Sequence, residues 1–226
     1  MTDPTWLTRS SADVPRDDAW LGPRERAVLA GLRIGKRRED WRLGRWTAKA
    51  AVAARLGAEP TRIEILAAPD GAPEAWLDGV PAPVSVSLSH RAGRAVAAVA
   101  VAPAVVGCDL ELVEPRSPAF VREWLTPREQ ALVAQRTGTE RDRLANLLWS
   151  AREAAAKVRR EGLRLDVRGA EVVLGAAGDG EWEPFSVRWD DGAPATTGWV
   201  RADRGWVMTI AGEPAPGRPL RLSASA

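Results

Sequence analysis

The strongest constraint on the fold is the order in which helical and strand patterns follow one another along the chain. A block of helical patterns precedes a block of short strands, and the same order then occurs a second time. Strands that are grouped apart from helices favour an α+β fold over a doubly wound parallel sheet. We therefore expect two similar α+β halves, residues 1–103 and 104–226, which are alike in structure but not in sequence.

Hydrophobic periodicity, capping residues and turn residues predict the individual elements. In the first half we expect helices over residues 24–33 and 39–56 and strands over 63–65, 84–90 and 95–101. In the second half we expect a strand over 105–111, helices over 118–125, from 126 onward and over 141–160, and strands over 170–174, 184–189, 197–201 and 206–210. The tail from Glu213 onward is rich in Pro, Ala and Ser, so we expect it to be loose.

The composition excludes several kinds of site. The chain has one cysteine, Cys108, and one histidine, His90. These counts exclude a disulfide framework, a cysteine-rich zinc site and a zinc centre made of histidines alone. The longest uncharged run, residues 95–108, is shorter than the roughly 20 residues that a membrane-spanning helix needs. Residues 1–20 lack the apolar core of a secretory signal, so we expect a cytoplasmic protein that does not bind a membrane.

The charge is nearly balanced overall but uneven along the chain. Lys and Arg number 32 and Asp and Glu number 30, a net charge of +2 that does not indicate nucleic-acid binding. Between Arg24 and Arg55, however, ten basic residues and three acidic ones give a local charge of +7. Such a segment suits an anionic ligand or an acidic partner, and a solvated helix face is the alternative.

Carboxylates and a lysine occur at spacings that would bring them together. Asp109 and Glu111 are two residues apart on an expected strand, so their side chains share one face. Trp149, Glu153 and Lys157 occur at four-residue intervals on an expected helix and line one stripe. If helix and strand face each other, three carboxylates could hold Mg²⁺, which prefers oxygen ligands. The alternatives are a solvated strand end and an ordinary surface Glu–Lys pair.

A third group of polar residues is Ser87-Leu88-Ser89-His90-Arg91, at the end of an expected strand. Ser89 and His90 could bind a phosphate group, whereas a solvated turn histidine is the alternative. The adjacent Ser and His diverge, and the chain has no G-x-S-x-G nucleophile motif, so a serine hydrolase is not expected. It also lacks the G-x-x-x-x-G-K-[ST] phosphate loop of common ATPases.

Taken in order, these motifs resemble those of the 4′-phosphopantetheinyl transferase superfamily, in its long single-chain, Sfp-type class. The resemblance extends from about residue 20 to 165 and rests on Gly44-Arg45…Lys49, Gly71-Ala72-Pro73, Ser87-Leu88-Ser89-His90, Val106-Gly107-Cys108-Asp109-Leu110-Glu111 and Trp149-Ser150-Ala151-Arg152-Glu153-Ala154-Ala155-Ala156-Lys157. The Gly-x-Asp-x-Glu and Trp…Glu…Lys elements are each weak alone but specific as a pair.

The resemblance implies a fold, a reaction and a set of site residues. The fold is a pseudo-dimer of two α+β halves. The reaction moves 4′-phosphopantetheine from coenzyme A to a serine of an acyl or peptidyl carrier protein of a polyketide, fatty-acid or nonribosomal peptide synthase, and releases adenosine 3′,5′-bisphosphate. The implied metal ligands for Mg²⁺ are Asp109, Glu111 and Glu153, the implied catalytic residues are Glu153 and Lys157, and the implied coenzyme A contacts are Arg45, Lys49, Ser89, His90 and Lys157. The protein is expected to act as a monomer.

Several alternatives stay open. Glu153, Glu129 or a water on the metal ion could accept the proton of the serine. Ala72 stands where the family often has a lysine, so Arg33, Lys36 or Arg91 would have to supply that charge. Arg160 replaces a frequent glycine, and Arg152 replaces a frequent lysine. The other functions considered are a metal-dependent phosphoesterase and a non-catalytic module that binds coenzyme A or a carrier protein.

The segment from Ser117 to Gln135, between the two motifs, is the expected docking site for the carrier. It carries apolar residues at helical spacing, which could either contact the carrier or belong to the core; they are Phe120, Val121, Trp124 and Leu125.

Overall fold

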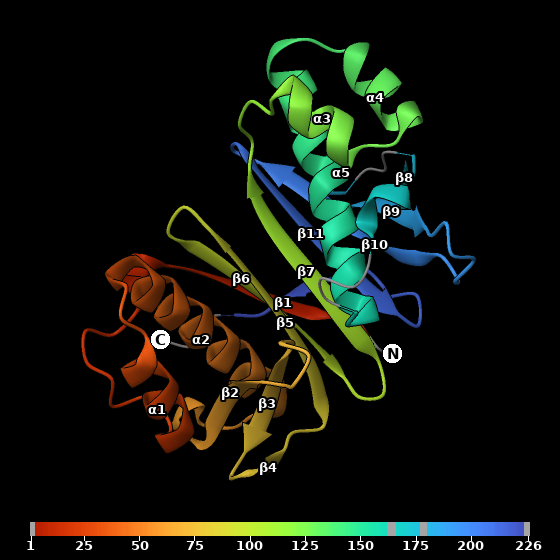
Figure 1. The fold of residues 1–226 in the computed structure, drawn as a ribbon. Coiled ribbons are helices and arrows are strands. Elements are labelled where there is room, and N and C mark those ends of the chain that lie inside the picture. The colour runs from red at the N-terminus through yellow and green to blue at the C-terminus, as the bar shows by residue number, and fades with distance from the viewer. Residues whose placement is uncertain (1–2, 162–165, 177–179, 224–226) are drawn as a thin grey trace.

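The computed structural model describes residues 3–161, 166–176 and 180–223 and shows two α+β halves lying side by side (Figure 1). The first half contains β1 (Thr5–Ser10), α1 (Pro23–Gly31), α2 (Gly35–Leu56), β2 (Ile63–Ala67), β3 (Pro73–Leu77), β4 (Val80–Pro81), β5 (Val84–Arg91) and β6 (Arg94–Val101). The second half contains β7 (Val105–Leu112), α3 (Pro118–Trp124), α4 (Pro127–Ala134), α5 (Gly138–Arg159), β8 (Glu171–Leu174), β9 (Glu183–Arg188), β10 (Thr196–Asp203) and β11 (Trp206–Glu213). The expected α+β fold is confirmed.

The strands form three sheets. Their orders are β12-β1-β6-β5 and β7-β11-β10-β9-β8 for the two main sheets and β2-β3-β4 for a small one. The short strand β12 (Leu220–Arg221) runs parallel to β1, and the other pairs are antiparallel. The chain therefore returns to the sheet of the first half at residues 220–221. The expectation of a loose tail from Glu213 onward is wrong at these two residues and at Glu213, which ends β11.

Each main sheet is covered by one long helix. In the first half α2 packs on β1, β5 and β6 over a core that includes Leu7, Val52 and Val99. In the second half α5 packs on β7 and β11 over a separate core that includes Leu148 and Val207. A third apolar cluster, which includes Trp6, Cys108 and Ile210, takes residues from both main sheets and so joins the halves.

The two halves also share a short sequence repeat, so the expectation that they would be alike only in structure is wrong. The helices α1 and α4 begin with Pro23-Arg24-Glu25 and Pro127-Arg128-Glu129. The helices α2 and α5 contain Trp46-Thr47-Ala48-Lys49 and Trp149-Ser150-Ala151-Arg152.

The repeated residues form the same buried contacts in both halves. Glu25 accepts hydrogen bonds from the backbone N–H groups of Gly22 (2.9 Å) and Ile65 (2.9 Å) and pairs with Lys49 (2.6 Å). Correspondingly, Glu129 accepts from Thr126 (2.8 Å) and Val172 (2.8 Å) and pairs with Arg152 (2.6 Å). One carboxylate thus caps a short helix, anchors the long helix and holds the strand that follows.

The strands β5 and β7 lie side by side at the junction of the halves but belong to different sheets. Val84, Val86 and Leu88 of β5 face the α2 core, and the intervening serines face β7. Ser85 Oγ accepts a hydrogen bond from the N–H of Val106 (3.1 Å), and Ser87 Oγ accepts one from that of Cys108 (3.0 Å). Hydrogen bonds from the N–H groups of β7 to serine hydroxyls of β5 therefore take the place of backbone–backbone hydrogen bonds between these two strands.

The buried pairs lead to a prediction about stability. Replacing Glu129 by Gln leaves the guanidinium of Arg152 buried without its counter-charge, which should lower the free energy of unfolding by about 3–5 kcal/mol at neutral pH. Glu25→Gln should lower the free energy of unfolding by less, because burial already lowers the pKa of Lys49 and its amine can lose the proton. Urea unfolding measures both losses.

The pH dependence separates the two variants. In Glu25→Gln the pKa of Lys49 in the folded protein falls further. Below about pH 10.4 the unfolded variant therefore binds more protons than the folded variant, and its free energy of unfolding should rise as the pH rises toward that value. In Glu129→Gln the guanidinium stays protonated, so no such recovery relative to the unaltered protein is expected. Equal pH dependence in both variants would contradict this account.

Candidate active site

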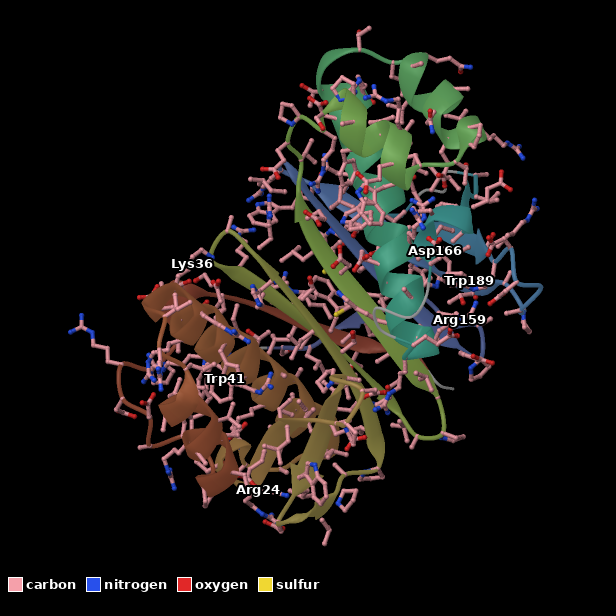
Figure 2. All side chains as sticks on the ribbon, in the orientation of Figure 1. Arg24, Lys36, Trp41, Arg159, Asp166 and Trp189 are labelled. Atoms are coloured by element: carbon pink, nitrogen blue, oxygen red, sulfur yellow. The ribbon has the colours of Figure 1, made fainter. Side chains whose placement is uncertain are left out.

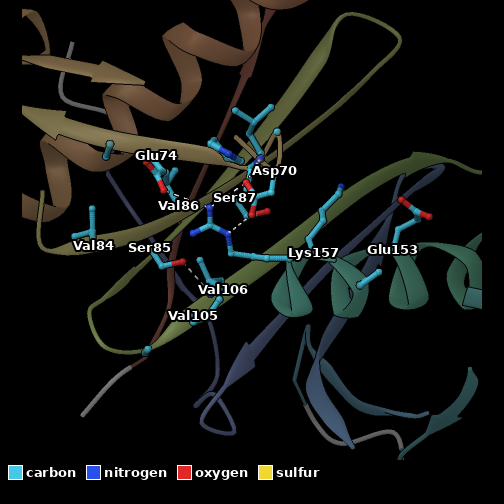
Figure 3. Close-up of a pocket in the computed structure, with 18 of the residues that line it drawn as sticks. Asp70, Glu74, Val84, Ser85, Val86, Ser87, Val105, Val106, Glu153 and Lys157 are labelled. Carbon is cyan, nitrogen blue, oxygen red and sulfur yellow. Dashed lines mark hydrogen bonds and ion pairs between the residues drawn. The ribbon is translucent and has the colours of Figure 1, made fainter. Parts of the chain in front are cut away.

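A cleft of about 1160 Å³ lies between the two halves. The first half contributes residues 70–76, from the turn between β2 and β3 and from β3 itself, together with residues of β5. The second half contributes the start of β7 and the C-terminal part of α5. Figure 3 shows Glu153 and Lys157 on α5 and Asp70 and Glu74 on the other side of the cleft.

Gly107 determines how closely α5 approaches β7. A Cβ atom at this position would lie 2.1 Å from the carbonyl oxygen of Ala154 and 3.1 Å from the Cβ of Lys157. Only glycine lets the helix backbone rest directly on the strand. This close packing brings Glu153 and Lys157 to the face of β7 that carries Asp109.

Asp109 is the most deeply placed carboxylate of the site, with 5% of its surface exposed. Its Oδ1 accepts hydrogen bonds from Ser89 Oγ (2.9 Å) and Lys157 Nζ (3.0 Å). The amine of Lys157 also donates to the carbonyl oxygen of Cys108 (2.9 Å). Although burial opposes it, the neighbouring Asp109, Cys108 and Glu153 raise the pKa of Lys157, so this lysine is positively charged. Among the described residues, Asp109 Oδ2 is buried without a partner.

Glu111 is held on both carboxylate oxygens. The indole Nε1 of Trp149 donates to Oε1 (3.1 Å), and the guanidinium of Arg116 donates to Oε2 (3.0 Å). The rings of Phe120 and Trp124 meet Trp149 edge-on, with centroids 5.4 and 5.3 Å away. The orientation of Glu111 therefore depends on an aromatic cluster that includes α3. Arg116 was missed by the sequence analysis, because it lies after the strand and outside both motifs.

Glu153 has no hydrogen bond or ion pair with any residue that the structure describes. Burial raises the pKa of Glu153, and the charges of Asp109 and Glu111 raise it further against the opposing effect of Lys157. Burial and Asp109 likewise raise the pKa of Glu111. The three carboxylates therefore lie close enough to repel one another, as expected if strand and helix face each other.

The carboxylates fit a hard divalent cation in their chemistry. Asp109 Oδ2 lacks a partner and Glu153 is unpaired among the described residues, so both offer oxygen ligands of the type that Mg²⁺ prefers. As the side chains stand, no group of three or more His, Cys, Asp or Glu residues in the described part of the chain is gathered tightly enough to hold a metal ion. Glu111 in particular would have to share oxygens that Arg116 and Trp149 now occupy.

A second, basic pocket of about 460 Å³ adjoins the cleft. It is lined by Ile34, Lys36, Arg37, Asp40, Trp41, Gly44, Arg45, Leu88 and His90. Arg45 lines both cavities, and its guanidinium lies over the Trp41 ring, 4.9 Å from the centroid. Its Nε is buried without a hydrogen-bond partner among the described residues. Figure 2 shows Lys36 and Trp41 on the same helix, α2. His90 is exposed here, and its pKa is lowered chiefly by desolvation.

Two residues from the sequence analysis lie elsewhere. Lys49 is fully buried against Glu25 and the carbonyl oxygen of Trp20 (2.7 Å), so its placement does not support a contact with coenzyme A. Glu129 is 1% exposed and engaged with Arg152, which does not support a role as proton acceptor. In both residues the charged group stabilises the fold through a buried ion pair.

The basic segment from Arg24 to Arg55 is also largely engaged within the protein. Arg24 pairs with Glu64, Arg38 donates to backbone carbonyl oxygens and Arg42 pairs with Asp18. Of the three substitutes considered for the absent lysine at Ala72, Lys36 lines the basic pocket, Arg91 pairs with Glu114, and Arg33 lines neither cavity.

Comparison with known families covers most of the chain. Residues 25–100 match the family model of the 4′-phosphopantetheinyl transferase N-terminal domain, and residues 105–211 match that of the 4′-phosphopantetheinyl transferase superfamily. No curated protein matches the chain. In the described part of the chain, no helix combines the length and apolar character needed to span a membrane.

The packing at Gly107 gives a second prediction. Gly107→Ala should force α5 away from β7 and lower the free energy of unfolding by about 1–3 kcal/mol, as overpacking does in other cores. Gly31→Ala is the matched control, because a Cβ there meets nothing within 4 Å. Thermal or urea unfolding of both variants measures the difference. An unchanged stability of Gly107→Ala would show that the contact with Ala154 can relax freely.

Proposed function

Because the chain belongs to the 4′-phosphopantetheinyl transferase superfamily, we propose that it moves 4′-phosphopantetheine from coenzyme A to a serine of an acyl or peptidyl carrier protein. Adenosine 3′,5′-bisphosphate is the second product. The observation that supports this most directly is the arrangement of the site: Glu153 and Lys157 line the cleft, Lys157 pairs with the buried Asp109 behind it, and Arg45 lines both the cleft and the basic pocket.

The proposed ligand accounts for the two cavities. Coenzyme A carries a pyrophosphate and a 3′-phosphate, so it needs cations at two places. In this proposal Lys157 and Ser89 meet the pyrophosphate, and Arg45 and His90, with Lys36 and Arg37, meet the 3′-phosphate. The first half, residues 1–103, then contributes most of the coenzyme A contacts, and the second half, residues 104–226, carries the carboxylates and the catalytic helix.

Asp109, Glu111 and Glu153 would hold the Mg²⁺ ion. When bound, the ion neutralises charge on the pyrophosphate oxygens and so improves the leaving group. The protein's own residues position the reactants and stabilise charge, which supplies most of the catalysis in phosphoryl transfer.

In the proposed reaction the serine oxygen of the carrier bonds to the phosphorus that bears the pantetheine arm, and the bond from that phosphorus to the departing nucleotide phosphate breaks. Glu153 is the proposed acceptor of the serine proton, directly or through water, because it lines the cleft beside Lys157 and has no partner among the described residues. Lys157 remains protonated and stabilises the negative charge on the departing phosphate.

The carrier is proposed to dock on α3 and α4. Arg122 on α3 and Arg136 just after α4 are exposed, as is Arg128 on α4, which pairs with Glu171. These cations make the surface suitable for an acidic helix. Of the apolar residues in this segment, Val121 and Leu125 belong to the core, whereas Phe120 and Trp124 are partly exposed beside Trp149.

The direct test is to incubate the protein with coenzyme A, Mg²⁺ and a panel of purified apo carrier proteins and to weigh the carriers by mass spectrometry. A carrier that gains the mass of phosphopantetheine supports the proposal. Release of free phosphopantetheine without any gain by a carrier would support a phosphoesterase instead, and binding of coenzyme A with no turnover would support a binding module.

The carboxylate site predicts a strong effect of one substitution. Asp109→Asn keeps the shape of the side chain but removes a metal-binding charge and the partner of Lys157, so turnover should fall a hundredfold or more, about 2.7 kcal/mol on the barrier. Steady-state rates over a Mg²⁺ titration measure this, with circular dichroism to confirm folding. Near-normal turnover of the folded variant at low Mg²⁺ would contradict the metal assignment.

The docking surface predicts a change in the Michaelis constant for the carrier. Phe120→Ala should raise KM for the carrier and leave the affinity for coenzyme A nearly unchanged, because the ring is partly exposed on α3 and lines neither cavity. The ring also packs against Trp149, which holds Glu111, so kcat should fall as well. Val121→Ala is the control for a core residue and should lower the melting temperature without a selective effect on the carrier. Loss of carrier and coenzyme A binding in equal measure by Phe120→Ala would assign Phe120 to the core.

A further inference from the structure

Arg160 lies at the C-terminal cap of α5, directly after the last helical residue, and its side chain reaches the opposite half of the protein. Its Nε donates to Asp70 Oδ2 (3.0 Å) and one terminal nitrogen donates to Asp70 Oδ1 (3.1 Å). The same terminal nitrogen lies 3.3 Å from Glu74 Oε1. This is a two-point pairing between guanidinium and carboxylate, a geometry that fixes direction as well as distance.

The backbone at Arg160 is in the left-handed region, with φ of 54°. Glycine adopts this conformation at helix ends more readily than any other residue. An arginine at this position is therefore disfavoured locally, and what it gains is the contact with Asp70 and Glu74. The contact is long-range, because it joins residues 90 and 86 positions apart in the sequence.

The three residues all line the cleft. Asp70 belongs to the turn between β2 and β3, Glu74 belongs to β3, and both are labelled in Figure 3. Arg160 follows α5 in the second half, so its ion pairs with them cross the space between the halves. The positive charge of Arg160 faces two carboxylates, so this group does not present a free cation to an anionic ligand. Their side chains are 41% (Arg160), 24% (Asp70) and 43% (Glu74) exposed, so water can reach the pairs and compete with them.

We propose that Arg160, Asp70 and Glu74 form a strap across the cleft, which opens to admit coenzyme A and to release the nucleotide product, and which closes between these events. The proposal rests on the proposed function for the identity of the ligand, and Arg160 acts in it as a positioning residue. A partly exposed pair is suited to such a role, because it orders the turn while remaining weak enough to open often.

The first test is amide hydrogen exchange of the ligand-free protein. In Arg160→Gly and in Asp70→Asn, exchange of residues 68–75 should accelerate by about two- to fivefold, the range expected for a partly exposed ion pair. Asparagine can still accept the hydrogen bond that the N–H of Ala72 donates to Asp70 (3.0 Å), so the turn itself is kept. The double variant should be no faster than either single variant, and Arg160→Lys should be slower than Arg160→Gly.

Two matched controls break ion pairs that do not cross the cleft. Arg159 is the residue before Arg160 on α5 and lies beside Trp189 in Figure 2. Arg159→Gln removes its pairs with Asp191 (2.6 Å) and Glu161, neither of which crosses the cleft. Asp78→Asn removes the pair with Arg62 near the other end of β2 and β3. Both should leave the exchange of residues 68–75 unchanged.

The second test is stopped-flow binding of coenzyme A. Loss of the strap should raise the association and dissociation rates together by about two- to fivefold and leave Kd nearly unchanged, and the unaltered protein should approach the variants as salt screens the pair.

Two results would contradict the proposed strap. The first is an exchange rate of residues 68–75 that stays unchanged in the single variants, or that rises further in the double variant. The second is a raised Kd for coenzyme A with an unaltered association rate, which would make Arg160 a ligand contact. If coenzyme A does not bind at all, the proposed function fails, whereas the exchange experiment still decides whether the strap exists.

Discussion

The candidate site depends on the junction between β5 and β7. These strands belong to different sheets, so the backbone N–H groups of β7 on this side need partners from outside its own sheet. Ser85 and Ser87 supply them, and Ser89, next in the same row of alternate residues, binds Asp109 instead. The row of β5 serines that hydrogen-bonds across the junction of the halves therefore extends into the candidate site. Ser89 of the first half holds Asp109, which lies on β7 of the second half, and Lys157 on α5 holds the same carboxylate, so the site forms only when the two halves are assembled.

Alignment of the two halves on the internal repeat shows that their long helices differ at the positions of the site residues. When Lys49 is aligned with Arg152, the residues that correspond to Glu153 and Lys157 are Ala50 and Ala54. Both long helices keep the buried cation that pairs with the capping glutamate, because each half needs it to fold. At these two positions only the second half carries charged side chains. The long helix of the first half has alanines there, and it supplies the cations of the basic pocket from its other positions.

Much of the fold could be predicted because most elements carry a local signal. The alternation of Val84, Val86 and Leu88 with serines indicated a strand, and the Thr126-Pro127-Arg128-Glu129 quartet indicated a helix start. The strand β1 was missed, because its neighbouring residues Trp6 and Leu7 are both buried, one toward the other half and the other toward α2, so the strand lacks alternation. The strand β3 was missed because it begins at Pro73, directly after Asp70-Gly71, and these residue types are typical of turns.

The sequence by itself determined the α+β class and the residue types of the site, since both follow from short-range spacing along strands and helices. It indicated that Asp109 and Glu111 share a strand face and that Glu153 and Lys157 share a helix stripe. Only the tertiary structure decided which charges are free for chemistry. Lys49 and Glu129 look like solvated, reactive groups in the sequence, yet burial removes them from water and each is compensated by a partner more than twenty residues away. Charges interact through space, so their partners cannot be determined from spacing along the chain.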